Sequence, residues 1–150
     1  MKSHQSRGFT LIELVVVITI LGILAAFAIP KFIALDTQAR TATVNGLVGT
    51  VKSAAALARS LAMATGNPAS VTMEGSPVAM LNNYPDSPLG GIPNAINVSA
   101  ADFTYAPGAS GAPGVWTRVG APTPAGCIVT YTPATAGGAP PQVVATVTGC

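Results

Sequence analysis

A single carboxylate inside an otherwise apolar stretch near the start of this chain restricts what the chain can fold into. From Phe9 to Ile29 the only charged side chain is Glu13. The stretch is about as long as the roughly 20 residues that a helix needs to cross the hydrocarbon core of a membrane. Ionisable residues in such segments are costly to place there, so they usually mark a functional site. The sequence therefore predicts a membrane-spanning helix in which Glu13 has a function.

The charged residues on either side of this stretch predict its orientation. Lys2 and Arg7 precede it, whereas Lys31, Asp36 and Arg40 follow it. Because the more basic flank of a membrane helix stays in the cytoplasm, we expect residues 1–8 to face the cytoplasm and the rest of the chain to lie outside.

The composition argues against an enzyme and against nucleic-acid binding. Charged residues make up only 8% of the chain, and its single histidine is His4. The sequence contains no catalytic triad, phosphate loop, zinc motif or dinucleotide fingerprint, and no cluster of Lys or Arg. We therefore expect no catalytic residues, no metal site, no cofactor and no nucleic-acid partner.

A second helical pattern follows the apolar stretch. Small and aliphatic residues recur at steps of three and four, which is typical of one buried face of an amphipathic helix. The pattern stops at Gly66-Asn67-Pro68, a sequence that favours a helix end. Pro30 lacks a backbone N–H, so we expect the helix to bend there. Gly22, eight residues earlier, is expected to loosen the helix. The buried face is predicted to contain Val44, Leu47, Val48, Val51, Ala54, Ala55, Ala58, Leu61 and Ala62.

The second half of the chain reads as short strands separated by Pro and Gly clusters, which is typical of a small antiparallel sheet. The sequence thus predicts an α+β fold in which a long N-terminal helix packs on that sheet. Residues 82–114 are expected to form a surface loop, and Trp116 is expected to pack on the sheet. The predicted strands are Ser70–Glu74, Pro77–Leu81, Val115–Val119, Cys127–Thr132 and Gln142–Thr148.

The two cysteines flank the last predicted hairpin. Cys127 opens its first strand and Cys150 follows its second strand. In an exported chain we expect them to form a disulfide, which would stabilise the fold by roughly 3–4 kcal/mol in the chain-entropy model. A metal-binding pair and an intermolecular bridge are the alternatives.

The run Gly8-Phe9-Thr10-Leu11-Ile12-Glu13 after a short basic leader resembles the processing site of type IV prepilins and type II secretion pseudopilins. The resemblance implies that a prepilin peptidase cuts after Gly8 and methylates the new N-terminal residue, Phe9. It implies that Glu13 and Phe9 act in assembly, and that Gly22 and Pro30 bracket a stretch that becomes extended in the filament.

The resemblance also implies an organisation and a set of partners. Residues 1–8 would be the leader, 9–30 the polymerising membrane half of the helix and 31–66 its amphipathic half. Residues 67–114 would be a variable Pro/Gly-rich region, and 115–150 a sheet with a disulfide-bounded C-terminal loop. The partners would be copies of the chain, the peptidase, a motor ATPase, an inner-membrane platform and an outer-membrane secretin.

Short matches extend the resemblance to the mannose-sensitive haemagglutinin class of type IV pilins. These matches are Pro30-Lys31-Phe32, Asp36-Thr37-Gln38-Ala39-Arg40, Cys127–Thr132 and Thr148-Gly149-Cys150. The function implied is that of the major subunit of a pilus, held in the inner membrane as a precursor and then assembled into a surface fibre. The fibre would serve adhesion and biofilm formation, and motility is a further role in the family. The alternatives are a secretion pseudopilin or a minor pilin.

A more remote alternative is a soluble exported binding domain. Ala26-Phe27-Ala28 has the form of an ordinary signal-peptidase site, and cutting there would start the product at Ile29. Such a signal would have no need of Glu13.

Cleavage after Gly8 would give Phe9 a cationic amine that can pair with Glu13. The two residues are at i and i+4, so the amine can reach Glu13 of its own chain, and it can also reach that of a neighbour. The sequence does not distinguish these pairings.

Overall fold

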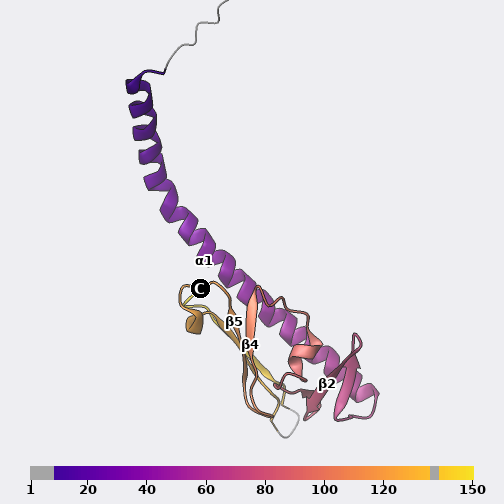
Figure 1. Cartoon of the computed structure of the whole chain (residues 1–150). Helices are drawn as coiled ribbons and strands as arrows, with labels where there is room; N and C mark the ends of the chain where they lie inside the picture. The colour runs from indigo at the N-terminus through magenta and orange to yellow at the C-terminus, as the bar shows by residue number, and fades with distance from the viewer. Residues whose placement is uncertain (1–8, 136–138) are drawn as a thin grey trace, which may run out of the picture. The chain divides into compact units, whose positions relative to one another are not determined.

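The computed structural model of this chain describes residues 9–135 and 139–150. The first element is the helix α1, Leu11–Ala64, and short strands and two 3₁₀ turns follow it (Figure 1). The chain divides after Thr37 into two compact units, and each is described by itself.

The part of α1 in the first unit is apolar and exposed. Ile12, Leu24 and Phe32 are all more than half exposed. Among the described residues, α1 is the one helix that is long and apolar enough to cross a membrane by length and composition. The helix is continuous through Gly22 and Pro30, so the secondary structure has no interruption at either residue. The extension of this stretch in a filament stays a prediction.

The part of α1 in the second unit buries the face that the sequence predicts. Seven of the nine predicted side chains are buried, and the other two, Val48 and Leu61, are half-buried. The helix ends as expected, because Gly66 and Asn67 have positive φ and the Asn67 N–H donates to the carbonyl of Ala62 at 2.7 Å. This is the bond of a Schellman cap. A methyl group added at Gly46 or at Gly49 would meet no atom within 4 Å. Close packing on the sheet therefore explains neither glycine.

The strands form two antiparallel sheets instead of one. The smaller sheet has the order β1-β2-β3, and the larger has the order β4-β5-β6-β7. Every pairing joins strands that are neighbours in sequence, so each sheet is a meander. The strands are β1 Ser70–Met73, β2 Ser76–Leu81, β3 Tyr84–Pro85, β4 Phe103–Ala106, β5 Gly114–Arg118, β6 Ile128–Thr132 and β7 Gln142–Thr146.

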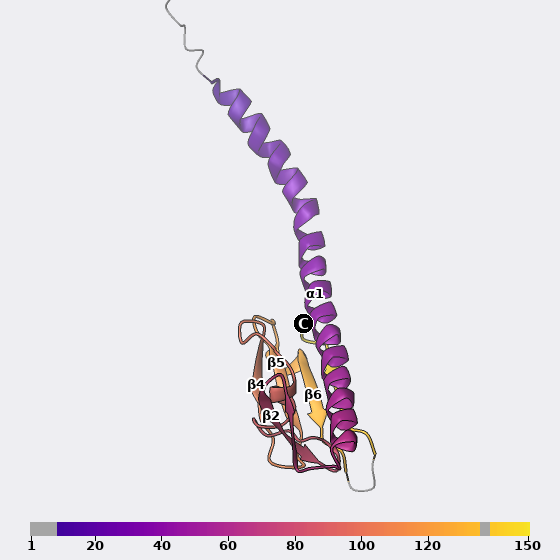
Figure 2. The ribbon, with the colours of Figure 1, turned by 90° about the vertical axis from the view of Figure 1, so that its right-hand side faces the viewer.

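The main core lies between α1 and the larger sheet. Figure 2 shows β6 beside the helix, and Val129 and Tyr131 of β6 share one buried cluster with Val44 and Val51 of α1. Trp116 on β5 is in the same cluster and is 2% exposed, which confirms its predicted packing role. This burial of apolar surface is the main term that holds helix and sheet together. The predicted α+β fold is therefore confirmed.

The expectation of a surface loop over residues 82–114 is wrong. This region contains β3, the 3₁₀ turn η1 at Ile92–Ala95 and the edge strand β4. It also contains a buried segment, residues 84–87, whose polar side chains make long-range hydrogen bonds.

Asp86 and Ser87 show why this polar segment can be buried. The carboxylate of Asp86 accepts hydrogen bonds from Ser87 N at 2.8 Å, Gly111 N at 3.0 Å and Ser110 Oγ. Ser87 Oγ donates to the Ala112 carbonyl, and the Tyr105 hydroxyl donates to the carbonyl of Ser87. A buried charge without such donors would be strongly destabilising. The network ties β3 to the loop that joins β4 and β5.

This network makes folding sensitive to alkaline pH. Burial, and then the charge of Asp86, raises the pKa of Tyr105 to about 12, whereas an unfolded tyrosine titrates near about 10. The stability that the protonated phenol provides is therefore complete below about pH 10 and is lost as the pH rises towards 12. We expect the melting temperature of the chain in detergent to fall over this range, and the fall to be smaller for Tyr105→Phe. Equal slopes for the two proteins would contradict this assignment.

Candidate functional site at the start of the helix

The first turn of α1 is closed by Thr10 and Glu13. Glu13 Oε2 accepts hydrogen bonds from Thr10 N at 2.8 Å and from Thr10 Oγ1 at 2.7 Å. In return, Glu13 N lies 3.4 Å from Thr10 Oγ1. This arrangement is a capping box, in which Thr at the N-cap and Glu three residues later satisfy free backbone N–H groups at the helix start. The helix therefore begins where it does because of these two side chains.

The other carboxylate oxygen of Glu13 takes no part in this cap. Within the described part of the chain, Oε1 accepts no hydrogen bond. The neighbouring side chains are apolar, because Phe9, Ile12, Val16 and Val17 line an open hollow on the helix surface next to Glu13. Phe9 is 85% exposed and lies two residues before the first residue of the helix. One oxygen thus caps the helix, while the second is available to a donor from outside the chain.

The other predicted site residues are spread along the chain. Gly8 and the leader 1–8 lie outside the described residues, so the cleavage and methylation at Gly8 and Phe9 stay predictions. Phe9 and Glu13 lie within one helical turn of each other. Gly22 and Pro30 lie further along α1 and contribute nothing to this turn.

The structure has the predicted disulfide between Cys127 and Cys150. Both residues are buried, and they join the start of β6 to the end of the chain. Arg40 on α1 donates a hydrogen bond from Nη1 to the backbone oxygen of Cys150 at 3.0 Å. The C-terminal segment is therefore fixed to the sheet by a covalent bond and to the helix by a hydrogen bond.

Two of these contacts were not predicted from the sequence. The pattern Thr10-Leu11-Ile12-Glu13 before an apolar run has the form of a capping box, so Thr10 could have been found from it. Arg40 gives no such signal, because its partner is 110 residues away in sequence. In residues 9–135 and 139–150 the structure has no group of three His, Cys, Asp or Glu residues that could hold a metal ion.

Together, the apolar part of α1 and the second unit, residues 38–150 (the head), define a class of protein. An exposed apolar helix whose second half packs on antiparallel sheets is a pilin-like α+β fold. The family described as the prokaryotic N-terminal methylation motif matches residues 3–29. The matched segment includes Gly8, Phe9 and Glu13.

Relatives of known identity match the same end of the chain. It is 50% identical over 54 residues to the type IV narrow pilus major component PilA5 of Thermus thermophilus, which is 36% of this chain and 47% of that protein. It is 57% identical over 47 residues to the type IV major fimbrial protein FimA of Dichelobacter nodosus, covering 31% and 28%. It is 41% identical over 54 residues to the type II secretion system core protein G of Pseudomonas aeruginosa, covering 36% and 38%.

These matches confirm the resemblance to type IV pilins. The chain spans less than half the length of each of these relatives, and no solved structure matches it significantly. The relatives named above do not bear on the mannose-sensitive haemagglutinin class, which stays a prediction.

Proposed function

We propose that this chain is the major structural subunit of a type IV pilus and has no enzymatic activity. The observation that carries the proposal is the first turn of α1. There Glu13 Oε1 accepts no hydrogen bond from the residues that the structure describes, and it lies at the start of an exposed apolar helix. Such a group needs a cationic partner once the helix is buried among others. The match to the methylation motif over residues 3–29 supports the same conclusion.

The partner that we propose is the amine of Phe9 in a neighbouring copy. Before cleavage the Phe9 nitrogen is an uncharged amide, and afterwards it is a cationic, methylated amine. In the monomer Thr10 holds one oxygen of Glu13 and leaves the other free. A neighbour's amine can therefore bind Oε1 without breaking the helix cap. A buried polar pair of this kind fixes the axial register between helices, as it does in coiled coils.

Contact between apolar helix surfaces would hold the subunits together. Ile12, Leu24 and Phe32 would leave water or lipid and pack against other helices in the centre of the fibre. The second unit, which holds the sheets and the disulfide, would form the outer part. The fibre would then present a surface of low charge for adhesion and biofilm formation.

The proposed route begins in the inner membrane. A prepilin peptidase cuts after Gly8 and methylates Phe9. An inner-membrane platform and a motor ATPase then add the subunit to the fibre, which leaves through an outer-membrane secretin to the cell surface.

A type II secretion pseudopilin is the second candidate, and the similarity to core protein G of Pseudomonas aeruginosa favours it. Such a protein would form a short periplasmic fibre in place of a long surface fibre. A minor pilin would be present in few copies in a fibre built from another chain.

Two measurements on the same cells test the proposal. Intact mass and N-terminal sequencing of the recovered protein should give a methylated Phe9 start, and electron microscopy of sheared surfaces should show long fibres made of this chain. A methylated Phe9 start without such fibres, together with a secretion defect on deletion, would support the pseudopilin. An Ile29 start with monomers in the culture fluid would reject both proposals.

A further inference from the structure

The head has few charged side chains, and one of its carboxylates is not used within the chain. Residues 38–150 contain three acidic side chains, those of Glu74, Asp86 and Asp102. Asp86 is buried in the network described above, and Oδ1 of Asp102 lies 3.3 Å from Nη1 of Arg118. Glu74 is exposed and makes no hydrogen bond or ion pair with any residue that the structure describes. Its charge is therefore available to a second molecule.

The turn that carries Glu74 gives no local reason for a glutamate. Glu74 and Gly75 are the two central residues of the hairpin between β1 and β2, and both have positive φ, 47° and 82°. Turns of this kind favour Asn, Asp and Gly at these positions. The hairpin between β2 and β3 follows this preference with Asn82 and Asn83. Because a glutamate is disfavoured in this conformation, we expect its side chain to have a function.

Two cationic side chains of α1 have no carboxylate partner among the described residues. Lys52 and Arg59 are seven residues apart, so they lie on the same side of the helix. Arg59 lies over the ring of Tyr84, 4.6 Å from its centroid, and donates a hydrogen bond to its hydroxyl. Lys52 is exposed and has no hydrogen bond or ion pair with a described residue. This side of the helix is therefore positively charged.

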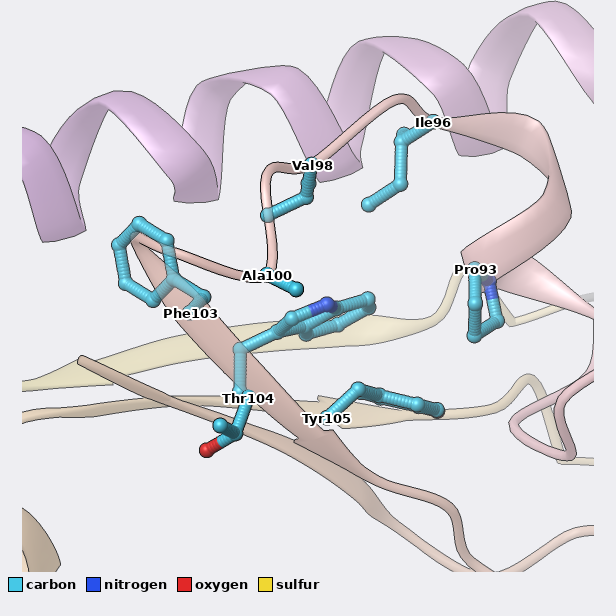
Figure 3. A pocket seen from close by; sticks show the side chains of 8 residues that line it. Pro93, Ile96, Val98, Ala100, Phe103, Thr104 and Tyr105 are labelled. Atoms are coloured by element: carbon cyan, nitrogen blue, oxygen red, sulfur yellow. The ribbon is translucent and has the colours of Figure 1, made fainter. Parts of the chain in front are cut away.

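Lys52 lines a small hollow whose size suits a single side chain. The hollow has a volume of about 240 Å³, which is below the range of about 300–1,000 Å³ for ligand pockets. A larger cavity of about 410 Å³, shown in Figure 3, has no charged residue in its lining and so offers nothing that would attract an ion. The residues that line the small hollow with Lys52 are Ala55, Ala56, Tyr84, Pro140, Pro141 and Val143.

The acidic turn and the cationic hollow lie on opposite flanks of the buried face of α1. Glu74 lines a different hollow together with Thr50 and Leu57 of the helix. At 100° per residue, Thr50 and Leu57 lie on one side of the buried face, and Lys52 and Arg59 lie on the other. Each head therefore has an anionic surface on one flank and a cationic surface on the other.

We propose that the Glu74 turn of one copy enters the Lys52 hollow of a neighbouring copy, where its carboxylate pairs with the Lys52 ammonium group. Arg59 adds positive charge beside the pair, and the apolar walls of the hollow exclude part of the water, which strengthens the attraction. Two different surfaces of one chain make a heterologous contact, which can repeat without closing and so favours a fibre. The inference rests on the proposed function, and it adds a contact between heads to the contact between helices.

Cross-linking with a carbodiimide tests the contact, because this reagent joins a carboxylate to an amine only where the two groups touch. Lys52→Gln and Glu74→Gln are expressed together in one strain, so that each chain keeps only one of the two groups. A cross-link between positions 52 and 74 then has to join two chains. Treated fibres should give a covalent dimer, and mass spectrometry should identify the peptide that contains both Lys52 and Glu74. Fibres from a strain that expresses Lys52→Gln alone are the matched control and should lack this peptide.

Exchanging the two charges gives a second readout. Lys52→Glu and Glu74→Lys should each lower the amount of this chain in the sheared fraction by about fivefold, because like charges then meet at every contact. The double variant restores opposite charges in exchanged places and should recover most of this loss. Both side chains are exposed, so the melting temperature of the detergent-extracted monomer should stay unchanged in all three variants.

The outcomes separate this contact from the proposed function. Fibres that form without the cross-linked peptide, or a double variant that stays at the level of the single variants, would overturn the contact while the proposed function stands. Failure of the unaltered chain to form any fibre would instead reject the proposed function, and this contact with it.

Discussion

Glu13→Val is expected to abolish fibres on the cell surface while the chain is still exported and cleaved after Gly8. The substitution removes the carboxylate whose Oε1 accepts no hydrogen bond within residues 9–135 and 139–150. Without it, the amine of Phe9 in a neighbouring subunit would be buried in an apolar bundle with no counter-charge. We expect a loss of fibres by at least one order of magnitude, measured by electron microscopy and by the amount of this chain in the sheared fraction. The head should remain folded, because Glu13 lies outside its buried clusters.

Thr10→Val is the matched control for this experiment. It removes the hydroxyl that bonds Oε2, but it keeps the carboxylate and the backbone bond from Thr10 N. If Glu13 acts on a neighbouring chain, this variant should still form fibres. Normal fibres from Glu13→Val would refute the proposed role. Equal losses in the two variants would show that capping the helix, and not the pairing, is what assembly requires.

Replacing both cysteines, Cys127→Ser with Cys150→Ser, should lower the free energy of unfolding by roughly 3–4 kcal/mol. The bridge closes a loop with a sequence separation of 23, and in its absence the unfolded chain gains conformational freedom. Urea unfolding of the full chain in detergent, followed by the fluorescence of Trp116, measures the change. An unfolding midpoint at the same urea concentration as for the unaltered protein would contradict this prediction.

Arg40→Gln separates the two links that hold the C-terminal segment. This variant keeps the disulfide but loses the charged donor that contacts the backbone oxygen of Cys150. A hydrogen bond from a charged group contributes about 1.5–3 kcal/mol, so the loss should be smaller than for the double serine variant. Treatment of the unaltered chain with a reductant should reproduce the effect of the serines.

The long helix and its buried face could be predicted because both are local patterns. Val44, Val51 and Ala58 recur with the helical period, and Gly66-Asn67 marks the end of the helix. The strand assignments were accurate where β-branched and aromatic residues are grouped, as in β6 and β7.

The region between residues 82 and 114 could not be predicted in this way. β4 has only four residues, and it is placed by its pairing with β5. Asp86 and Ser87 have the composition of a turn, but partners more than twenty residues away make their burial possible. Such contacts depend on which chain segments meet in space, and neither propensity nor periodicity contains that information.

The site shows the same limit at the scale of atoms. The charge of Glu13 and the motif around it predict that this residue has a function, which stays a prediction, whereas the same reasoning assigns no role to Thr10. The different environments of the two carboxylate oxygens appear only when the first turn of the helix is seen in three dimensions.

The division of the chain after Thr37 determines how a water-soluble version can be obtained. Every buried side chain of α1 lies between Val44 and Ala62, so a fragment that begins at Gln38 retains the complete helical contribution to the core. It would omit the exposed apolar side chains that require detergent. A later start, beyond Val51, would expose the buried face of β6 and promote aggregation. Gln38 is therefore the natural starting point for crystallisation and for producing the head as an antigen.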